Sequence, residues 1–171
     1  MDMEGSGGAV DTLAERIRHA AGPYGVPSHV VRRIAYTLAG QAAVFVDVDL
    51  TETASLLTGR VAVFTERHLA VATVNGLTDR REDDAGDVHL TVLPRHSLTA
   101  IQVAPLGNPL RNNVMAWRPD RTGFEDAGWP SRAAVSLTYP ALDTAVVLPS
   151  RRSTENFDAF LPSLLDDLAG A

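Results

Sequence analysis

The 171-residue sequence contains no cysteine and no lysine, and all 15 of its basic residues are arginine. Without cysteine there is no disulfide, thiolate metal ligand or cysteine nucleophile, and without lysine there is no Schiff-base chemistry on a side-chain amine. No apolar run approaches the roughly 20 residues of a transmembrane helix. The opening residues, MDMEGSGG, lack the apolar stretch of a secretory signal. We therefore expect a soluble, cytoplasmic protein, and the arginine, alanine and valine bias is typical of a bacterial source.

Motifs for catalysis and nucleotide binding are also missing. The sequence contains no G-x-S-x-G, no G-x-x-x-x-G-K and no G-x-G-x-x-G. His68, His89 and His96 are not spaced to place two imidazoles on one metal ion. Asp47 and Asp49 share one face of a predicted strand, and we interpret them as its solvated face, since the other face carries valines. We expect no catalytic residue, no metal and no cofactor.

The net charge of −6 argues against binding to nucleic acid. Residues 1–40 hold four acids and four arginines, which cancel, so the remaining 17 acids and 11 arginines carry the whole net charge (11 − 17 = −6). Contacts to phosphates require clustered cations, which an acidic body does not offer.

Two helices are predicted at the N-terminal end. Thr12 and Glu15 form a capping-box pattern, and Gly22-Pro23 ends the first helix. The second helix begins at Pro27-Ser28 and ends at Gly40. Its apolar stripe is Val30, Val31, Ile34, Ala35 and Leu38.

From residue 44 the apolar period changes from 3.6 to 2, which indicates strands. We predict seven of them, at residues 44–49, 61–66, 69–74, 88–92, 98–104, 133–139 and 144–148. A last helix follows Ser153, and its large apolar residues share one face: Phe157, Phe160, Leu161, Leu164, Leu165 and Leu168. Pro162 lies inside this helix and is expected to kink or split it.

Three stretches of this sequence resemble the pleckstrin-homology-like superfold. TGRVAVFTERHLAVATV is similar to the second and third strands of bacterial pleckstrin-homology-like and GRAM-type domains, and VHLTVLPRHSLTAIQV to their fourth and fifth strands. VVLPSRRSTENFDAFLPSLLDDL resembles their last strand and capping helix. The resemblance implies an α+β, mainly β fold, in which a seven-stranded antiparallel barrel and a C-terminal capping helix occupy residues 41–169. Residues 9–40 would form a two-helix extension, and residues 1–8 a disordered start.

The resemblance implies binding rather than catalysis, and the hairpin GRVAVFTERHLAVATVNG is interpreted as scaffold. Pleckstrin-homology-like domains mostly recognise phosphoinositides, peptides or partner proteins. The phosphoinositide-binding members place basic residues at the end of the first strand and at alternating positions of the second. This sequence has Asp47 and Asp49, then Arg60 and Ala62, at the corresponding positions. We therefore do not expect binding to phosphoinositide membranes.

The irregular segment PLGNPLRNNVMAWRPDRTGFEDAGWP is the predicted place for a partner-binding site, because aromatic residues and arginines dominate binding hot spots. The candidate residues are Arg111, Asn112, Trp117, Arg118, Arg121, Phe124 and Trp129. The alternative is that these aromatic residues fold back and close the barrel.

We thus predict a non-enzymatic protein-interaction or assembly module that serves a protein partner or its own oligomer. One alternative is a small-molecule-binding or enzymatic α+β cone, in which Asp47 and His89 would face an internal polar cavity. A terminal amphipathic helix counts against the cone. A third possibility is an acidic dimer of the secretion-chaperone kind, although those folds interrupt their strands with a helix.

Overall fold

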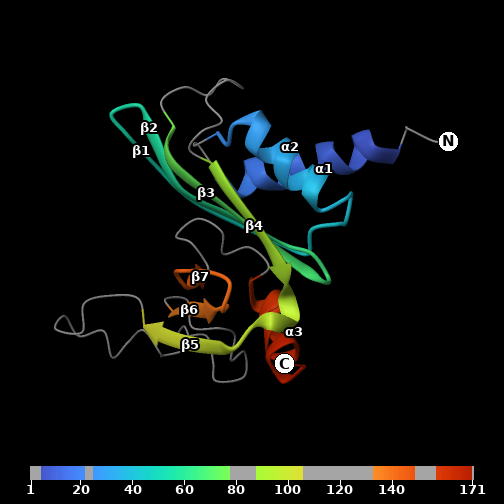
Figure 1. Cartoon of the computed structure of the whole chain (residues 1–171), viewed down its shortest axis with the longest axis vertical. Coiled ribbons are helices and arrows are strands. Elements are labelled where there is room, and N and C mark those ends of the chain that lie inside the picture. The colour runs from blue at the N-terminus through green and yellow to red at the C-terminus, as the bar shows by residue number, and fades with distance from the viewer. Residues whose placement is uncertain (1–4, 22–24, 78–87, 106–132, 149–156, 171) are drawn as a thin grey trace, which may run out of the picture. The chain divides into compact units, whose positions relative to one another are not determined.

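The computed structural model describes residues 5–21, 25–77, 88–105, 133–148 and 157–170 (Figure 1). The chain divides into two compact units, the first made of residues 1–96 and 150–154, the second of residues 97–149 and 155–171. Seven strands occur at the predicted places, but the described strands form two separate antiparallel sheets, in the orders β1-β2-β3-β4 and β5-β6-β7. The closed seven-stranded barrel of the prediction is therefore replaced by a mixed α+β arrangement of two sheets.

The first unit opens with two helices, α1 (Gly5–Ala21) and α2 (Ser28–Thr37). The capping box predicted at Thr12 is wrong, because α1 begins seven residues earlier and includes part of the expected disordered start. Thr12 lies inside the helix, and its hydroxyl donates to the carbonyl of Gly8 at 2.8 Å. A threonine within a helix commonly satisfies its hydroxyl in this way. The second helix begins where Pro27-Ser28 predicted it.

Four antiparallel strands follow the helices: β1 (Phe45–Thr53), β2 (Leu56–Phe64), β3 (His68–Leu77) and β4 (Val88–Pro94). Gly59 pairs with Leu50 across the first two strands and has a φ of 139°. A Cβ at this position would stand 2.0 Å from the backbone oxygen of Asp49. Only glycine fits such a close approach of two backbones.

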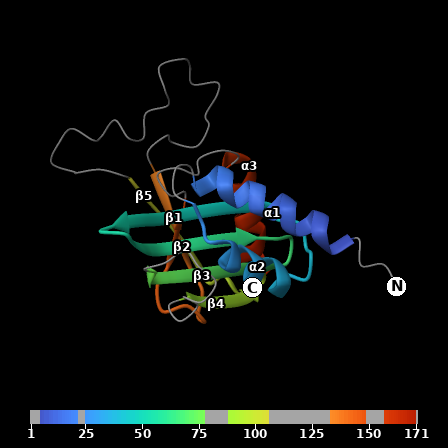
Figure 2. The same cartoon turned by 90° about the horizontal axis from the view of Figure 1, so that it is seen from above.

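Both helices cover one face of this sheet (Figure 2). Their buried residues, among them Ile17 and Ile34 at 0% exposure, form one cluster with the helix-facing side chains of the strands, such as Val48, Val63 and Ala72. Arg16 of α1 also donates to the carbonyls of Ala43 and Val44, which lead into β1. The two helices therefore pack on the sheet and share the core of the first unit.

The opposite face of the sheet is also buried at one end. Phe45, Phe64, Leu69 and Leu93 lie side by side across the four strands, and each is at most 4% exposed. The rings of Phe45 and Phe64 are 6.1 Å apart and tilted by 55°, within the range of favourable aromatic pairs. Because both faces of the sheet are buried at this end, apolar residues occupy successive positions of the strands there and not only alternate ones.

The second unit contains β5 (Ala100–Pro105), β6 (Ala133–Thr138), β7 (Val146–Leu148) and the C-terminal helix α3 (Phe157–Ala169). A short 3-10 turn, Arg95–Ser97, precedes β5. Pro162 lies inside α3 and does not split it, and the hydroxyl of Ser163 donates to the carbonyl of Phe160 at 2.7 Å. Phe157, Phe160 and Leu164 are buried, whereas Leu165 is 54% exposed. No described helix is long and apolar enough to cross a membrane.

Candidate partner-binding surface

The partner-binding residues predicted from the aromatic segment all lie outside the described residues. They are Arg111, Asn112, Trp117, Arg118, Arg121, Phe124 and Trp129. The choice between a binding segment and a structural flap therefore stays a prediction.

The carboxylate of Asp47 is fully buried. The interpretation of Asp47 and Asp49 as one solvated face is wrong for Asp47 and holds for Asp49, which is exposed. Arg60 on the neighbouring strand places its Nη2 3.5 Å from Oδ2 of Asp47. A buried carboxylate requires such a countercharge, so this ion pair belongs to the structure of the sheet.

Asp47 and His89 do not come together as the cone alternative requires. β1 and β4 are the two edges of the sheet, with β2 and β3 between them. Three strand spacings amount to about 14 Å. His89 lies instead in a row with Asp49, Arg60 and Thr73, two residue pairs further along the ladder than Asp47. At that distance neither side chain can orient the other by direct contact.

The turn between β2 and β3 uses its polar groups for itself. The hydroxyl of Thr65, which is 1% exposed, accepts the backbone N–H of His68 at 2.9 Å and lies 3.0 Å from Oε1 of Gln41. Nδ1 of His68 is also 3.0 Å from that amide oxygen. The buried Arg95 donates from Nη1 to the carbonyl of Thr65 at 2.9 Å. These contacts give the turn a structural role, as expected of a scaffold hairpin.

No group of three or more His, Asp or Glu side chains in the described part of the chain is placed to hold a metal ion.

The outward side of α2 carries a stripe of polar and aromatic residues. Its members are His29, Arg32, Arg33 and Tyr36, which we call the α2 stripe. Their spacing of i, i+3, i+4 and i+7 places them on one side of a helix. The apolar residues Val31, Ile34 and Leu38 occupy the other side and are buried. One side of α2 thus belongs to the core, whereas on the other side Arg32, Arg33 and Tyr36 are exposed and His29 is buried.

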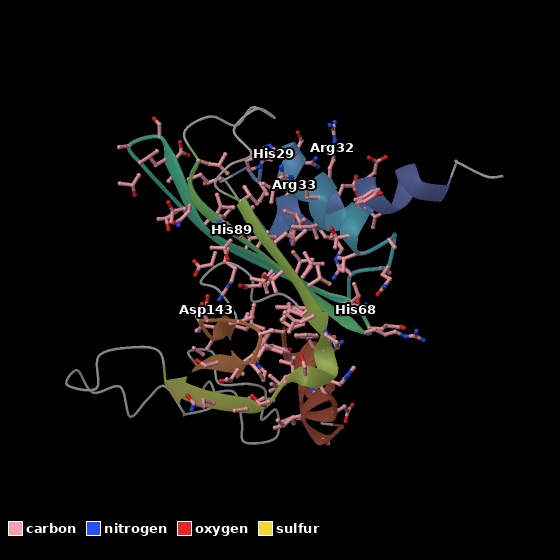
Figure 3. The ribbon with its side chains drawn as sticks, in the orientation of Figure 1. His29, Arg32, Arg33, His68, His89 and Asp143 are labelled. Carbon is pink, nitrogen blue, oxygen red and sulfur yellow. The ribbon has the colours of Figure 1, made fainter. Side chains whose placement is uncertain are left out.

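Tyr36 is the most exposed large hydrophobic side chain in the described residues, at 89%. Arg32 precedes it by four residues and Arg33 by three, so two exposed arginines are its neighbours one turn earlier on the helix surface. Figure 3 shows Arg32 extending outward from α2. Sequence reasoning used only the apolar stripe of this helix. The same periodicity, applied to its polar positions, is the signal that would have found this surface.

At the start of the stripe, His29 is only 7% exposed, and neither ring nitrogen has a hydrogen-bond partner within the described residues. It lies in the first turn of α2 (Figure 3). The N-cap residue is Pro27, which makes no side-chain capping bond, and the first turn contains no acidic residue. The stripe therefore runs from a buried imidazole at the uncapped helix start to an exposed aromatic ring near its end.

No family model matches the sequence, and no curated protein matches it. Among solved structures, the chain is similar to a DUF1696 family protein with a pleckstrin-homology domain from Shewanella loihica PV-4. The two chains are 13% identical, with a TM-score of 0.39 over 80% of this chain and 92% of that chain. Both the identity and the TM-score are low, and a functional assignment therefore depends on this chain's own residues.

Proposed function

We propose that this chain is a non-enzymatic protein-interaction module of pleckstrin-homology-like architecture, which binds an acidic partner protein through the α2 stripe. Seven antiparallel strands followed by one C-terminal helix is the element order of that superfold. The described polar groups of the strands favour a structural role over chemistry, since Asp47 is paired with Arg60 inside the sheet.

The exposure of Tyr36 is the observation that carries the proposal. Tyrosine has a large apolar ring, and 89% exposure leaves most of that ring in water. Tyrosine and arginine are the residues most enriched in the energetically dominant part of interfaces. Tyr36 with Arg32 and Arg33 combines both types on one helix side, with a rigid sheet beneath.

Charge determines the kind of partner. Residues 5–40 contain two acids, Asp11 and Glu15, and four arginines, so this layer has a net charge of +2 on a protein of −6. A symmetric dimer through the α2 stripe would bring arginines of both copies together, which is unfavourable. An acidic segment of another protein would instead pair with both guanidinium groups while covering Tyr36.

The proposal is tested with a photo-reactive amino acid at position 36 in cells of the source organism, followed by reconstitution with the purified partner. We expect one protein adduct, and binding of that protein weakened by Tyr36→Ala by about 2 kcal/mol, or roughly thirtyfold. The charge reversals Arg32→Glu and Arg33→Glu should weaken it too, while Arg67→Glu, an exposed arginine at the β2–β3 turn, should not.

Two results would contradict the proposal. One is a partner that binds the Tyr36→Ala variant as tightly as the unaltered protein. The other is an adduct formed only with a second copy of this chain, accompanied by a dimeric mass in solution that Arg32→Glu leaves unchanged.

A further inference from the structure

His29 is a polar side chain with an unusual position. It is more than nine-tenths buried, yet both nitrogens of its ring are without a hydrogen-bond partner in the described residues. A neutral imidazole has one N–H donor and one acceptor nitrogen. Burying both without partners is destabilising, and such groups call for a ligand, water or ion that satisfies them.

The backbone around His29 offers further donors. The first N–H groups of a helix have no partner within the helix, and the helix dipole makes this end positive. Val30 and Val31 donate their N–H groups to the carbonyl of Pro27, which leaves the N–H groups of Ser28 and His29 for a ligand. No side chain caps this start, and no acidic residue lies in the first turn. An uncapped helix start without negative charge is suited to an anion.

Arg32 and Arg33 lie one turn further along the same side of α2, at i+3 and i+4 from His29. Residues at these spacings are neighbours on a helix surface, about 5–6 Å apart at their Cβ atoms. Both arginines are exposed. A guanidinium group binds phosphate or carboxylate oxygens through two parallel N–H donors, more strongly than neutral donors do.

We propose that the first two turns of α2 form a binding site for an oxyanion of the phosphate-monoester class, held by His29, Arg33 and the N–H groups of the helix start, with Arg32 at its edge. The ring N–H of His29 donates to one oxygen and the guanidinium of Arg33 to two others. A tetrahedral oxyanion matches donors that converge from different directions. This site shares a helix side with the partner surface, but it does not require the partner or Tyr36.

The experiment titrates sodium phosphate into the full chain at constant ionic strength, with chloride as the replaced anion. NMR follows the His29 ring and the amides of residues 28–30. We expect saturable shifts there, and a melting temperature that rises with phosphate, because a ligand that binds only the folded state stabilises it. Arg33→Gln should raise the dissociation constant about tenfold or more, the effect of losing one charge-assisted contact.

His29→Leu separates binding from folding. This variant removes the unsatisfied nitrogens, so it should melt at the same or a higher temperature in chloride and lose the rise with phosphate. Arg67→Gln and Tyr36→Ala should retain the phosphate affinity of the unaltered protein. If Tyr36→Ala abolishes partner binding but phosphate still binds, the two proposals are independently supported.

A phosphoserine peptide distinguishes the sources of the oxyanion. Binding of this peptide at least as tight as that of phosphate, without binding of the unphosphorylated peptide, would identify a phosphorylated protein as the source. Tighter binding of inorganic phosphate would identify a free phosphate compound, and the site itself would stand in both cases. A linear response without saturation, or unchanged affinity in both His29→Leu and Arg33→Gln, would overturn the proposal.

Discussion

Asp47 on β1 and Arg60 on β2 form an ion pair diagonally across the sheet, with 3.5 Å between Oδ2 and Nη2. Asp47 is fully buried, and the side chain of Arg60 is 18% exposed. The ion pair therefore lies on the sheet face opposite the helices, at the boundary between the buried apolar end of that face and its row of exposed residues. An ion pair of this kind is expected to specify how the strands meet more than it adds to stability.

Removing one charge of this pair should destabilise the protein more than removing both. Asp47→Asn or Arg60→Met alone should cost about 3 kcal/mol, since each removes one charge of a pair that lies largely out of water. Asp47→Leu combined with Arg60→Met should cost less than either single change. Urea unfolding of the three variants measures the difference. Single variants that unfold at the midpoint of the unaltered protein would show that the pair is not coupled.

The burial of Asp47 shows where sequence reasoning reaches its limit. Alternation located the strands correctly, because half-buried strands impose a period of two. The same alternation predicted that Asp47 is exposed to solvent, because the opposite face of the strand carries the valines that pack on the helices. The apolar residues Ala62, Phe64, Leu69 and Val71 occupy the same face as Asp47, and they are the signal that this face is buried too. Identifying Arg60 as the counterion of Asp47 requires the pairing register of β1 and β2, and the sequence pattern does not give that register.

The helix ends and the candidate site were less predictable than the strands. The capping-box pattern at Thr12 matched a motif, but a threonine can bond equally well to a carbonyl one turn earlier, as it does with Gly8. The α2 stripe depends on which side of a helix is left in water, and that is decided by packing against the sheet. Once Ile34 is placed in the core, Tyr36 must lie near the opposite side.

Ile34 and Tyr36 form a matched pair on one helix. Ile34 is 0% exposed and Tyr36 is 89% exposed. Ile34→Ala should lower the free energy of unfolding by about 2–5 kcal/mol, the cost of a large-to-small change in a core. Tyr36→Ala should change it by less than about 0.5 kcal/mol, because the ring contributes little burial. Calorimetry of both variants tests whether α2 contributes to the core through Ile34 and whether Tyr36 contributes little to stability.

Gly59 and Gly76 provide a second matched pair, because both have a positive φ, 139° and 65°. An added Cβ at Gly76 meets nothing within 4 Å, whereas at Gly59 it stands 2.0 Å from the backbone oxygen of Asp49. Gly76→Ala should therefore cost only the left-handed conformation, about 1 kcal/mol. Gly59→Ala should cost at least about 3 kcal/mol, since two strands must also separate. Equal losses in chemical denaturation would mean that β1 and β2 can adjust.

The turn at Thr65 offers a test of the prediction that the β2–β3 hairpin is scaffold. The Thr65 hydroxyl accepts N–H groups from Arg67 and His68, at 3.3 and 2.9 Å, and lies 3.0 Å from Oε1 of Gln41. Thr65→Val keeps the shape and removes the hydroxyl, so the N–H groups of Arg67 and His68 lose this acceptor and Gln41 loses one of its two contacts.

We expect Thr65→Val to lower the free energy of unfolding by about 1–3 kcal/mol, because a buried polar contact is lost without a replacement. Thr65→Ser keeps the hydroxyl and loses one methyl group, which should cost about 1 kcal/mol or less. Amide hydrogen exchange at residues 67 and 68 should quicken in Thr65→Val and stay slow in Thr65→Ser. If both variants lose the same stability and exchange at the same rate, the methyl group and not the hydroxyl supports the turn.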